Sequence, residues 1–178
     1  KDEEKAEDVV RRLTEEVRRV HEKTRDVVRR VTERSNDVSR RSKEEVRELL
    51  ERADDLARKG KISEELVRRV KEELERVVRE DEELNEDLKR KLDDLLRRDE
   101  KLVREIERRL EEVVKLVRDG MSVEDLIREL KRLVDELRER SEDLIRKAER
   151  VLERLEEESR RLLKELRDLL EDVTRKAE

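Results

Sequence analysis

Apolar residues along this chain recur with a period of 18 residues. The repeat is clearest in the middle of the chain, where successive units begin at Ser63, Asp81 and Asp99. Each unit places apolar residues mainly at slots 4, 5, 8, 12, 15 and 16. At about 100° per residue, 18 residues make about five whole turns, so each slot returns to the same helix face. The period therefore predicts straight helices, each with one apolar stripe about 120° wide.

Two short interruptions divide the repeat into three helical segments. Gly60 can adopt the left-handed conformation that ends a helix, and Ser63 can cap the next helix. Gly120 and Ser122 repeat this arrangement. Hydrophobic staples are predicted at both turns, listed as pairs: Ile62 with Val67, and Met121 with Leu126. We expect helices at about 2–59, 63–119 and 122–177.

Equal segment lengths and short turns together predict the fold. Helices joined by such turns pack as antiparallel neighbours, with their apolar stripes facing inward. The predicted fold class is all-α: a monomeric, antiparallel, up-down-up three-helix bundle of long, nearly straight helices. We expect residues 1–178 to form a single domain.

Slot 1 lies at the centre of the apolar stripe, yet it is polar in seven of its positions, one of which is the capping residue Ser63. Antiparallel pairing brings the other six residues level in two layers, each with one carboxylate and two hydroxyls. The layers are Thr24 with Asp99 and Ser141, and Ser42 with Asp81 and Ser159. A buried carboxylate loses water, and hydroxyl donors can partly replace that hydration. We interpret the layers as a hydrogen-bond network that selects the helix register. The alternatives are a string of waters, a bound cation, or a different helix pairing; this ligand set would hold a divalent cation poorly.

Other polar residues fall close to these layers. Ser35, Ser39 and Asn85 occupy stripe positions and are predicted to extend the Asp81 network. His21, the only histidine, lies about one turn from Thr24 and is predicted to bond to the network or to solvent. With Ser141 and Asp99, His21 supplies the residue types of a catalytic triad. Mid-helix backbone N–H groups are already bonded and leave no oxyanion hole, so we predict no enzyme activity.

Composition narrows the remaining possibilities. Charged residues make up 59% of the chain, with 50 basic and 55 acidic side chains finely interspersed, and there is no aromatic residue. Without a basic stripe or a stacking side chain, nucleic acid is an unexpected partner. No apolar run suits a membrane span or signal peptide, so we expect a soluble protein. No cysteine is present, and Lys1 in place of an initiator Met suggests processing or a cleaved tag.

The whole chain resembles de novo designed, parametrically generated helical bundles of the untwisted, 18-residue-repeat kind that carry buried hydrogen-bond networks. The resemblance rests on equal helix lengths, idealised Gly and Ser turns, dense Glu and Arg surfaces, and polar residues recurring in register. It implies a stable scaffold without catalytic activity. Spectrin-like triple-helix spacers are similar in topology only, because they usually carry a core Trp and a heptad pattern.

The leading prediction is a structural scaffold, a rigid helical rod with no natural biochemical function, whose polar layers specify helix pairing. We expect no cofactor, no metal site and no required partner. The alternative is a protein-interaction module or a building block of a larger assembly. Leu50, beside Thr14 and Thr32 on the first stripe, is the main hint of a second surface, with Leu116 as a lone companion.

Overall fold

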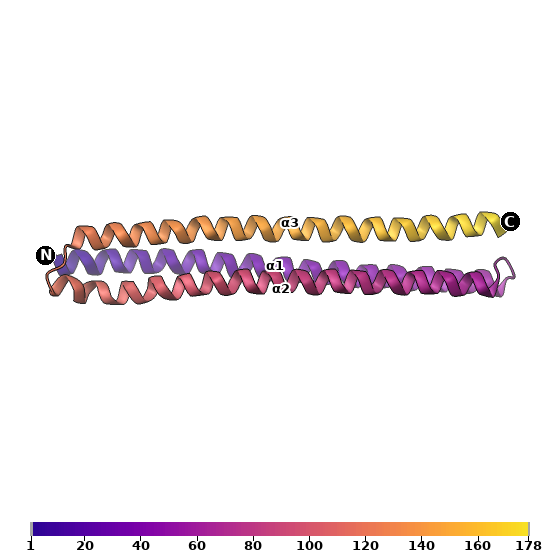
Figure 1. Cartoon of the computed structure of the whole chain (residues 1–178), viewed down its shortest axis with the longest axis horizontal. Helices are drawn as coiled ribbons and strands as arrows, with labels where there is room; N and C mark the ends of the chain where they lie inside the picture. Colours follow the sequence, from indigo (N-terminus) through magenta and orange to yellow (C-terminus); the bar gives the residue numbers. More distant parts are fainter. Residues whose placement is uncertain (1, 178) are drawn as a thin grey trace. The chain divides into compact units, whose positions relative to one another are not determined.

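The computed structural model describes residues 2–177, without the side chains of residues 176 and 177. Three long helices make up the protein: α1 (Asp2–Arg58), α2 (Glu64–Arg118) and α3 (Val123–Ala177), labelled in Figure 1. They pack together with contacts between all pairs, which confirms the predicted all-α three-helix bundle. The helix ends differ from prediction by at most one residue, because the residues next to each turn lie outside the helices.

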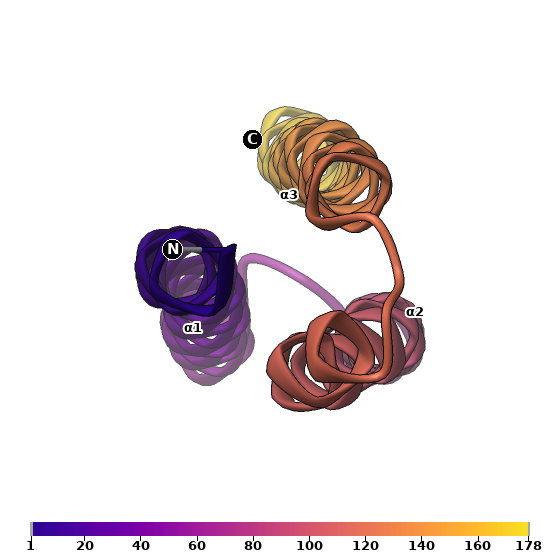
Figure 2. The same cartoon turned by 90° about the vertical axis from the view of Figure 1, so that its left-hand side faces the viewer.

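The chain forms two compact units, and each helix contributes to both. Unit 1 contains Lys1–Arg30 and Lys91–Glu149, and unit 2 contains Val31–Arg90 and Arg150–Glu178. Unit 1 includes the α2–α3 turn, which lies close to the N-terminus at the end facing the viewer in Figure 2. Unit 2 includes the α1–α2 turn. Each unit therefore holds one turn and three helix segments.

The turn between α1 and α2 ends one helix and caps the next. Gly60 has a φ of 70°, and its N–H donates to the Ala57 carbonyl at 3.0 Å. The Lys61 N–H reaches back to the Leu56 carbonyl at 3.0 Å, which completes a Schellman motif. The Ser63 hydroxyl then accepts a hydrogen bond from the Leu66 N–H at 3.2 Å. The sequence predicted this stop and this cap from two residues.

The turn between α2 and α3 repeats the Schellman bonds but lacks the predicted staple. Gly120 has a φ of 93°, and the Met121 N–H donates to the Leu116 carbonyl at 3.1 Å. Met121 is 51% exposed, whereas Ile62 at the equivalent place in the first turn is 7% exposed. The prediction that Met121 packs as a staple is therefore wrong. A flexible, unbranched side chain fixes its position less firmly than the branched Ile62 does.

Each unit has its own apolar core. In unit 1, Val17, Ile106 and Leu137 are fully buried and belong to one cluster drawn from all three helices. In unit 2, Ala53, Leu74 and Leu170 are likewise buried and belong to a second cluster drawn from all three helices. Truncating a larger member of these clusters, such as Ile106 or Leu74, would leave a cavity, because the surrounding core relaxes only partially.

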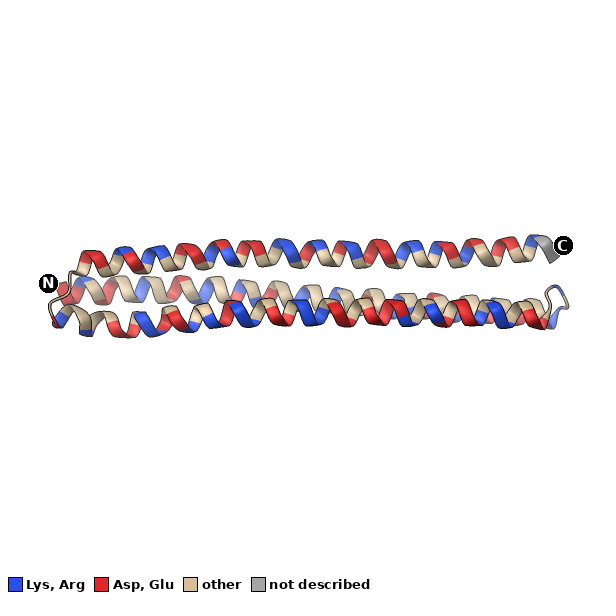
Figure 3. Ribbon diagram, in the orientation of Figure 1, with Lys and Arg blue, Asp and Glu red and all other residues tan. Residues whose placement is uncertain are grey.

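The outer surface carries the charge. Lys and Arg alternate with Asp and Glu along the helices, as Figure 3 shows. Many ion pairs join residues three or four apart on one helix, such as Lys59 with Asp55 at 3.0 Å, where helix geometry places them side by side. Over residues 2–177, no helix has a stretch both long and apolar enough to cross a membrane.

Candidate functional site

The polar residues predicted at slot 1 are buried in both units. In unit 1 they are Thr24, Asp99 and Ser141, which together with His21 we call the Asp99 layer. In unit 2 they are Ser42, Asp81 and Ser159, which together with Ser39 we call the Asp81 layer. None of the six slot-1 residues is more than 5% exposed. Each layer lies within a single unit, among apolar core residues.

The Asp99 layer contains a chain of two hydroxyls. Thr24 Oγ1 donates to the carbonyl of Val20, one turn earlier on α1, at 2.9 Å. Thr24 Oγ1 also shares a hydrogen bond with Ser141 Oγ of α3. A hydroxyl has one proton, so when Thr24 gives its proton to Val20, Ser141 must donate to Thr24. This chain joins α1 to α3 directly.

Asp99 is placed beside the hydroxyl chain but does not accept from it. Asp99 Oδ2 lies 3.7 Å from His21 Nδ1, too far for a hydrogen bond and close enough for a charge interaction. The Asp99 side chain is 2% exposed, and that of His21 is 21% exposed. Among the described residues, neither Asp99 oxygen has a hydrogen-bond partner. Burial raises the pKa of Asp99, against the opposing effect of a charge on His21.

The Asp81 layer repeats the hydroxyl chain in unit 2. Ser42 Oγ donates to the Val38 carbonyl at 3.0 Å and lies 2.5 Å from Ser159 Oγ. The two hydroxyl pairs span the same sequence separation, 117 residues. Thus α1 and α3 share one register in both units.

Asp81 is also without a hydrogen-bond partner among the described residues. Burial raises the pKa of Asp81, while the nearby hydroxyl of Ser39 and the charge of Lys43 act in the opposite direction. The Lys43 ammonium is itself paired with Glu82 at 2.9 Å on the surface, where water screens its charge. Desolvation of the carboxyl therefore outweighs its neighbours.

The predicted hydration of each carboxylate by two hydroxyls is not what the structure shows. Each hydroxyl pair bonds internally and to a backbone carbonyl. Serine and threonine inside a helix commonly donate to the carbonyl four residues earlier. The hydroxyl protons of Thr24 and Ser42 therefore stay on α1 and do not reach the aspartates of α2. Composition could predict the layer but not which acceptor each proton would choose.

Asn85 forms a separate cluster in unit 2. The Ser35 hydroxyl donates to the Asn85 amide oxygen, and Asn85 Nδ2 donates to Asn36 Oδ1 at 3.5 Å. By the antiparallel pairing of α1 and α2, Asn85 is expected nearest in height to Ser39, whereas its bond goes to Ser35, one turn away. The Asn85 side chain is long enough to reach that turn. Asn36 lies off the apolar stripe and is exposed, yet its amide oxygen still accepts from Asn85.

The chemistry open to the Asp99 layer follows from these contacts. The Ser141 hydroxyl bonds Thr24, and His21 faces Asp99, so no hydrogen bond among the described residues joins the serine to the histidine. Within residues 2–177, no group of three His, Asp or Glu side chains is arranged to hold a metal ion. The arrangement can hold helices in register and can store a proton on a buried carboxyl.

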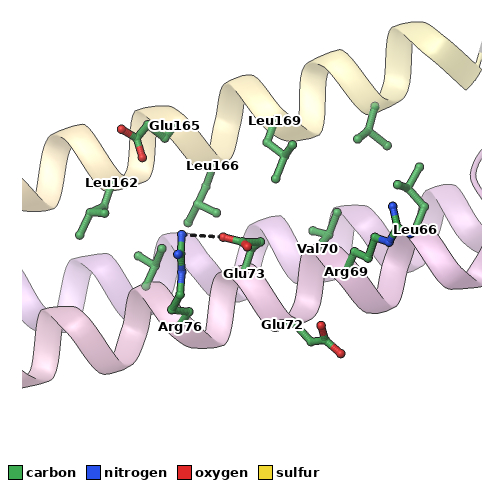
Figure 4. A pocket seen from close by; sticks show the side chains of 12 residues that line it. Leu66, Arg69, Val70, Glu72, Glu73, Arg76, Leu162, Glu165, Leu166 and Leu169 are labelled. Carbon is green, nitrogen blue, oxygen red and sulfur yellow. Dashed lines mark ion pairs between the residues drawn. The ribbon is translucent and has the colours of Figure 1, made fainter.

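Sequence analysis missed an apolar groove between α2 and α3 in unit 2. Leu166 and Leu169 point from α3 toward α2 in Figure 4, opposite Val70 and Leu66. The groove has a volume of about 510 Å³, and Leu169 on its wall is 39% exposed. Arg76 and Glu73 form an ion pair of 2.7 Å at its edge. Leu169 stands at slot 11 of the unit that begins at Ser159, outside the usual apolar slots, and this was the signal for the groove.

Comparison of the sequence and the structure with protein-family models, curated proteins and solved structures gives no match.

Proposed function

We propose that this chain is a structural scaffold in which the two polar layers specify how the helices pair. The observation that carries the proposal is the shared register of the Thr24–Ser141 and Ser42–Ser159 hydroxyl pairs. Sliding α3 by one turn would separate both pairs at once and leave buried hydroxyls without partners. Each buried group left unmatched costs about 1–3 kcal/mol, so an alternative register is penalised in both units.

The pattern of the chain supports a designed origin for this scaffold. The 18-residue unit, the pair of Schellman turns and the polar layers in register follow the rules of idealised bundle construction. Buried polar groups in such proteins serve to exclude competing helix pairings rather than to add stability. We infer a de novo designed, untwisted bundle that needs no cofactor or partner.

Replacing both buried carboxylates tests the scaffold proposal. We expect the double variant Asp81→Leu/Asp99→Leu to stay helical and to match or exceed the parent in stability, because desolvated acids are removed from the core. It should also lose discrimination between registers and oligomeric states. Light scattering should give a concentration-independent mass near 21.7 kDa for the parent and a mixture for the variant.

If the double variant is as homogeneous as the parent, the carboxylates do not specify how the helices pair. Ser141→Ala/Ser159→Ala then provides the second measurement, because it removes the hydroxyl pairs themselves and leaves both acids. If neither double variant changes the distribution of species, the polar layers do not specify pairing and the proposal is wrong.

A second candidate is an interaction module that self-associates through the α2–α3 groove of unit 2. Leu169, which is 39% exposed on the wall of that groove, favours it. A parent mass that rises with concentration, and returns to 21.7 kDa in Leu169→Glu, would support this candidate over a monomeric scaffold. Asp168→Lys is the matched control, because it changes charge on the neighbouring exposed position and leaves the apolar wall intact.

The scaffold proposal assigns no catalytic role to His21 or Ser141. We expect activated-ester hydrolysis by the parent to equal that of His21→Ala and of Ser141→Ala. A clear drop in either variant would reopen the assignment of an acyl-transfer site in the Asp99 layer.

A further inference from the structure

The seam between α2 and α3 is open in unit 2 and closed in unit 1. Leu66 and Leu169 line the groove of unit 2, where Leu66 is half-buried and Leu169 is 39% exposed. Two repeats away, the same slots hold Leu102 and Leu133 in unit 1, which are 6% and 7% exposed. The repeat therefore places leucines at equivalent positions in both units, and only those of unit 2 keep apolar surface uncovered.

The ion pairs beside the seam differ between the units in the same sense. In unit 1, Arg109 of α2 crosses to Glu129 of α3 at 2.6 Å. In unit 2, Arg76 lies at the edge of the groove and pairs instead with Glu73 of its own helix at 2.7 Å. This pair does not cross the seam, so it leaves the groove open to a further partner.

The charge left unpaired along the groove is negative on both walls. Arg69, the other arginine of the groove, pairs with Glu65 one turn earlier at 3.5 Å. Glu72 of α2 and Glu165 of α3 also line the groove, are exposed, and have no ion pair within residues 2–177. Figure 4 shows these two glutamates on opposite walls, one on each helix. Such edges attract a cationic partner and repel an anionic one.

The length of the groove suits an α-helix. Its lining extends from Leu66 to Val77 on α2 and from Leu162 to Val173 on α3. At 1.5 Å per residue each wall is about 17 Å long, or about three helical turns. A helix that binds in a groove presents one apolar side chain to it on nearly every turn. A helix of a few turns therefore matches the uncovered apolar surface.

We propose that the α2–α3 groove of unit 2 binds an amphipathic helix whose apolar stripe is flanked on both sides by Lys or Arg. The apolar side chains of the partner pack between Val70 and Leu166, and its basic side chains pair with Glu72 and Glu165. The bound helix gives unit 2 the apolar cover that the seam of unit 1 already has. This proposal depends on the fold and the groove alone, and it holds whether or not the polar layers specify helix pairing.

A second copy of the chain suits the same groove less well. Two grooves placed face to face would bring the unpaired Glu72 and Glu165 of one copy against those of the other. The net charge of −5 on each chain adds to this repulsion. A basic helix from a different molecule meets neither obstacle.

Two synthetic peptides that differ only in charge test the proposal on the parent protein. Each is a fluorescently labelled helix of about 18 residues with the same leucine stripe, flanked by lysine in one peptide and by glutamate in the other. Fluorescence anisotropy at about 0.15 M salt should show saturable binding of the lysine peptide and at least about tenfold weaker binding of the glutamate peptide. No saturable binding of the lysine peptide, equal affinities, or tighter binding of the glutamate peptide would each overturn the proposal.

Substitutions on the walls test whether the peptide binds in the groove. Glu72→Gln/Glu165→Gln removes both unpaired charges and should weaken binding of the lysine peptide about three- to tenfold. Glu75→Gln/Glu171→Gln is the matched control, because it makes the same change in net charge at exposed positions of α2 and α3 outside the groove. Equal weakening by the two double variants would show general attraction to an acidic protein and would overturn the assignment to the groove.

Methyl NMR of the parent protein locates the bound peptide without any substitution. Addition of the lysine peptide should shift the methyl signals of Leu66 and Leu169. The signals of Leu102 and Leu133 should stay in place, because these leucines are buried at the same slots in unit 1. Shifts of similar size in both units, or shifts confined to unit 1, would contradict the proposal.

Discussion

The Asp99 layer and the Asp81 layer begin from the same slot of the repeat, and in each a hydroxyl pair joins α1 to α3. Their carboxyls nevertheless meet different surroundings. Asp99 faces His21 and a cavity, whereas Asp81 faces serine hydroxyls in a space too small for water. One neighbour on α1 therefore changes how a buried acid can be neutralised. Identical layer composition does not imply identical electrostatics.

The strongest way to break the comparison is to destabilise one unit at a time. Leu137 in unit 1 is 0% exposed and Leu74 in unit 2 is 1% exposed. Changing either to Ala should cost about 2–5 kcal/mol, because the cavity cannot fully close. Amide hydrogen exchange should show the loss of protection concentrated in the unit that carries the change. If each variant instead loses protection equally in both units, the two units unfold together.

A smaller effect is expected from removing one hydroxyl in each layer. Ser141→Ala and Ser159→Ala each delete the donor to the α1 hydroxyl, at a cost of about 1 kcal/mol. We expect similar costs in the two layers, because each hydroxyl pair joins the same two helices through the same arrangement of bonds. Denaturant unfolding at pH 7 measures both. Clearly unequal losses would show that the two hydroxyl pairs do not contribute alike.

The smallest expected effect sharpens the electrostatic side of the comparison. His21→Gln removes the one group on α1 that can place a positive charge beside Asp99. The pKa of Asp99, already raised by burial, should rise further. Stability from this layer, full in acid, should then be lost at higher pH than in the parent. NMR titration of the Asp99 carboxyl measures the shift, with the Asp81 carboxyl as the internal control that should not move.

Much of the fold was predictable because it depends on the period of the apolar pattern and on the backbone conformation of two glycines. An 18-residue repeat places slot 1 on one helix face, and Gly60 and Gly120 mark where the chain must reverse direction. Neither feature depends on side-chain rotamers. The number of helices, their bounds to within one residue and their antiparallel pairing therefore follow from the residues alone.

The sequence predicted which polar residues lie at the same height in the bundle, but not which of them form hydrogen bonds. Placing Thr24 level with Ser141 needed only the rise per residue, and the two do bond. Choosing Ser35 over Ser39 as the partner of Asn85 needed side-chain reach, which the repeat does not encode. The preference of Ser42 for the Val38 carbonyl over Asp81 is a competition between two acceptors of similar strength.

Gly60 and Gly120 carry a consequence of mirror symmetry. A Cβ added to either glycine would meet no atom within 4 Å, so space does not dictate these residues. Only the positive φ does, and that value disfavours L-amino acids alone. A D-alanine introduced by chemical synthesis at either position would fit the turn in its own preferred conformation. It would also restrict the unfolded chain, for a gain of about 0.4–1 kcal/mol per site. Both ends of α2 are therefore places where opposite chirality suits the backbone better than any encoded side chain.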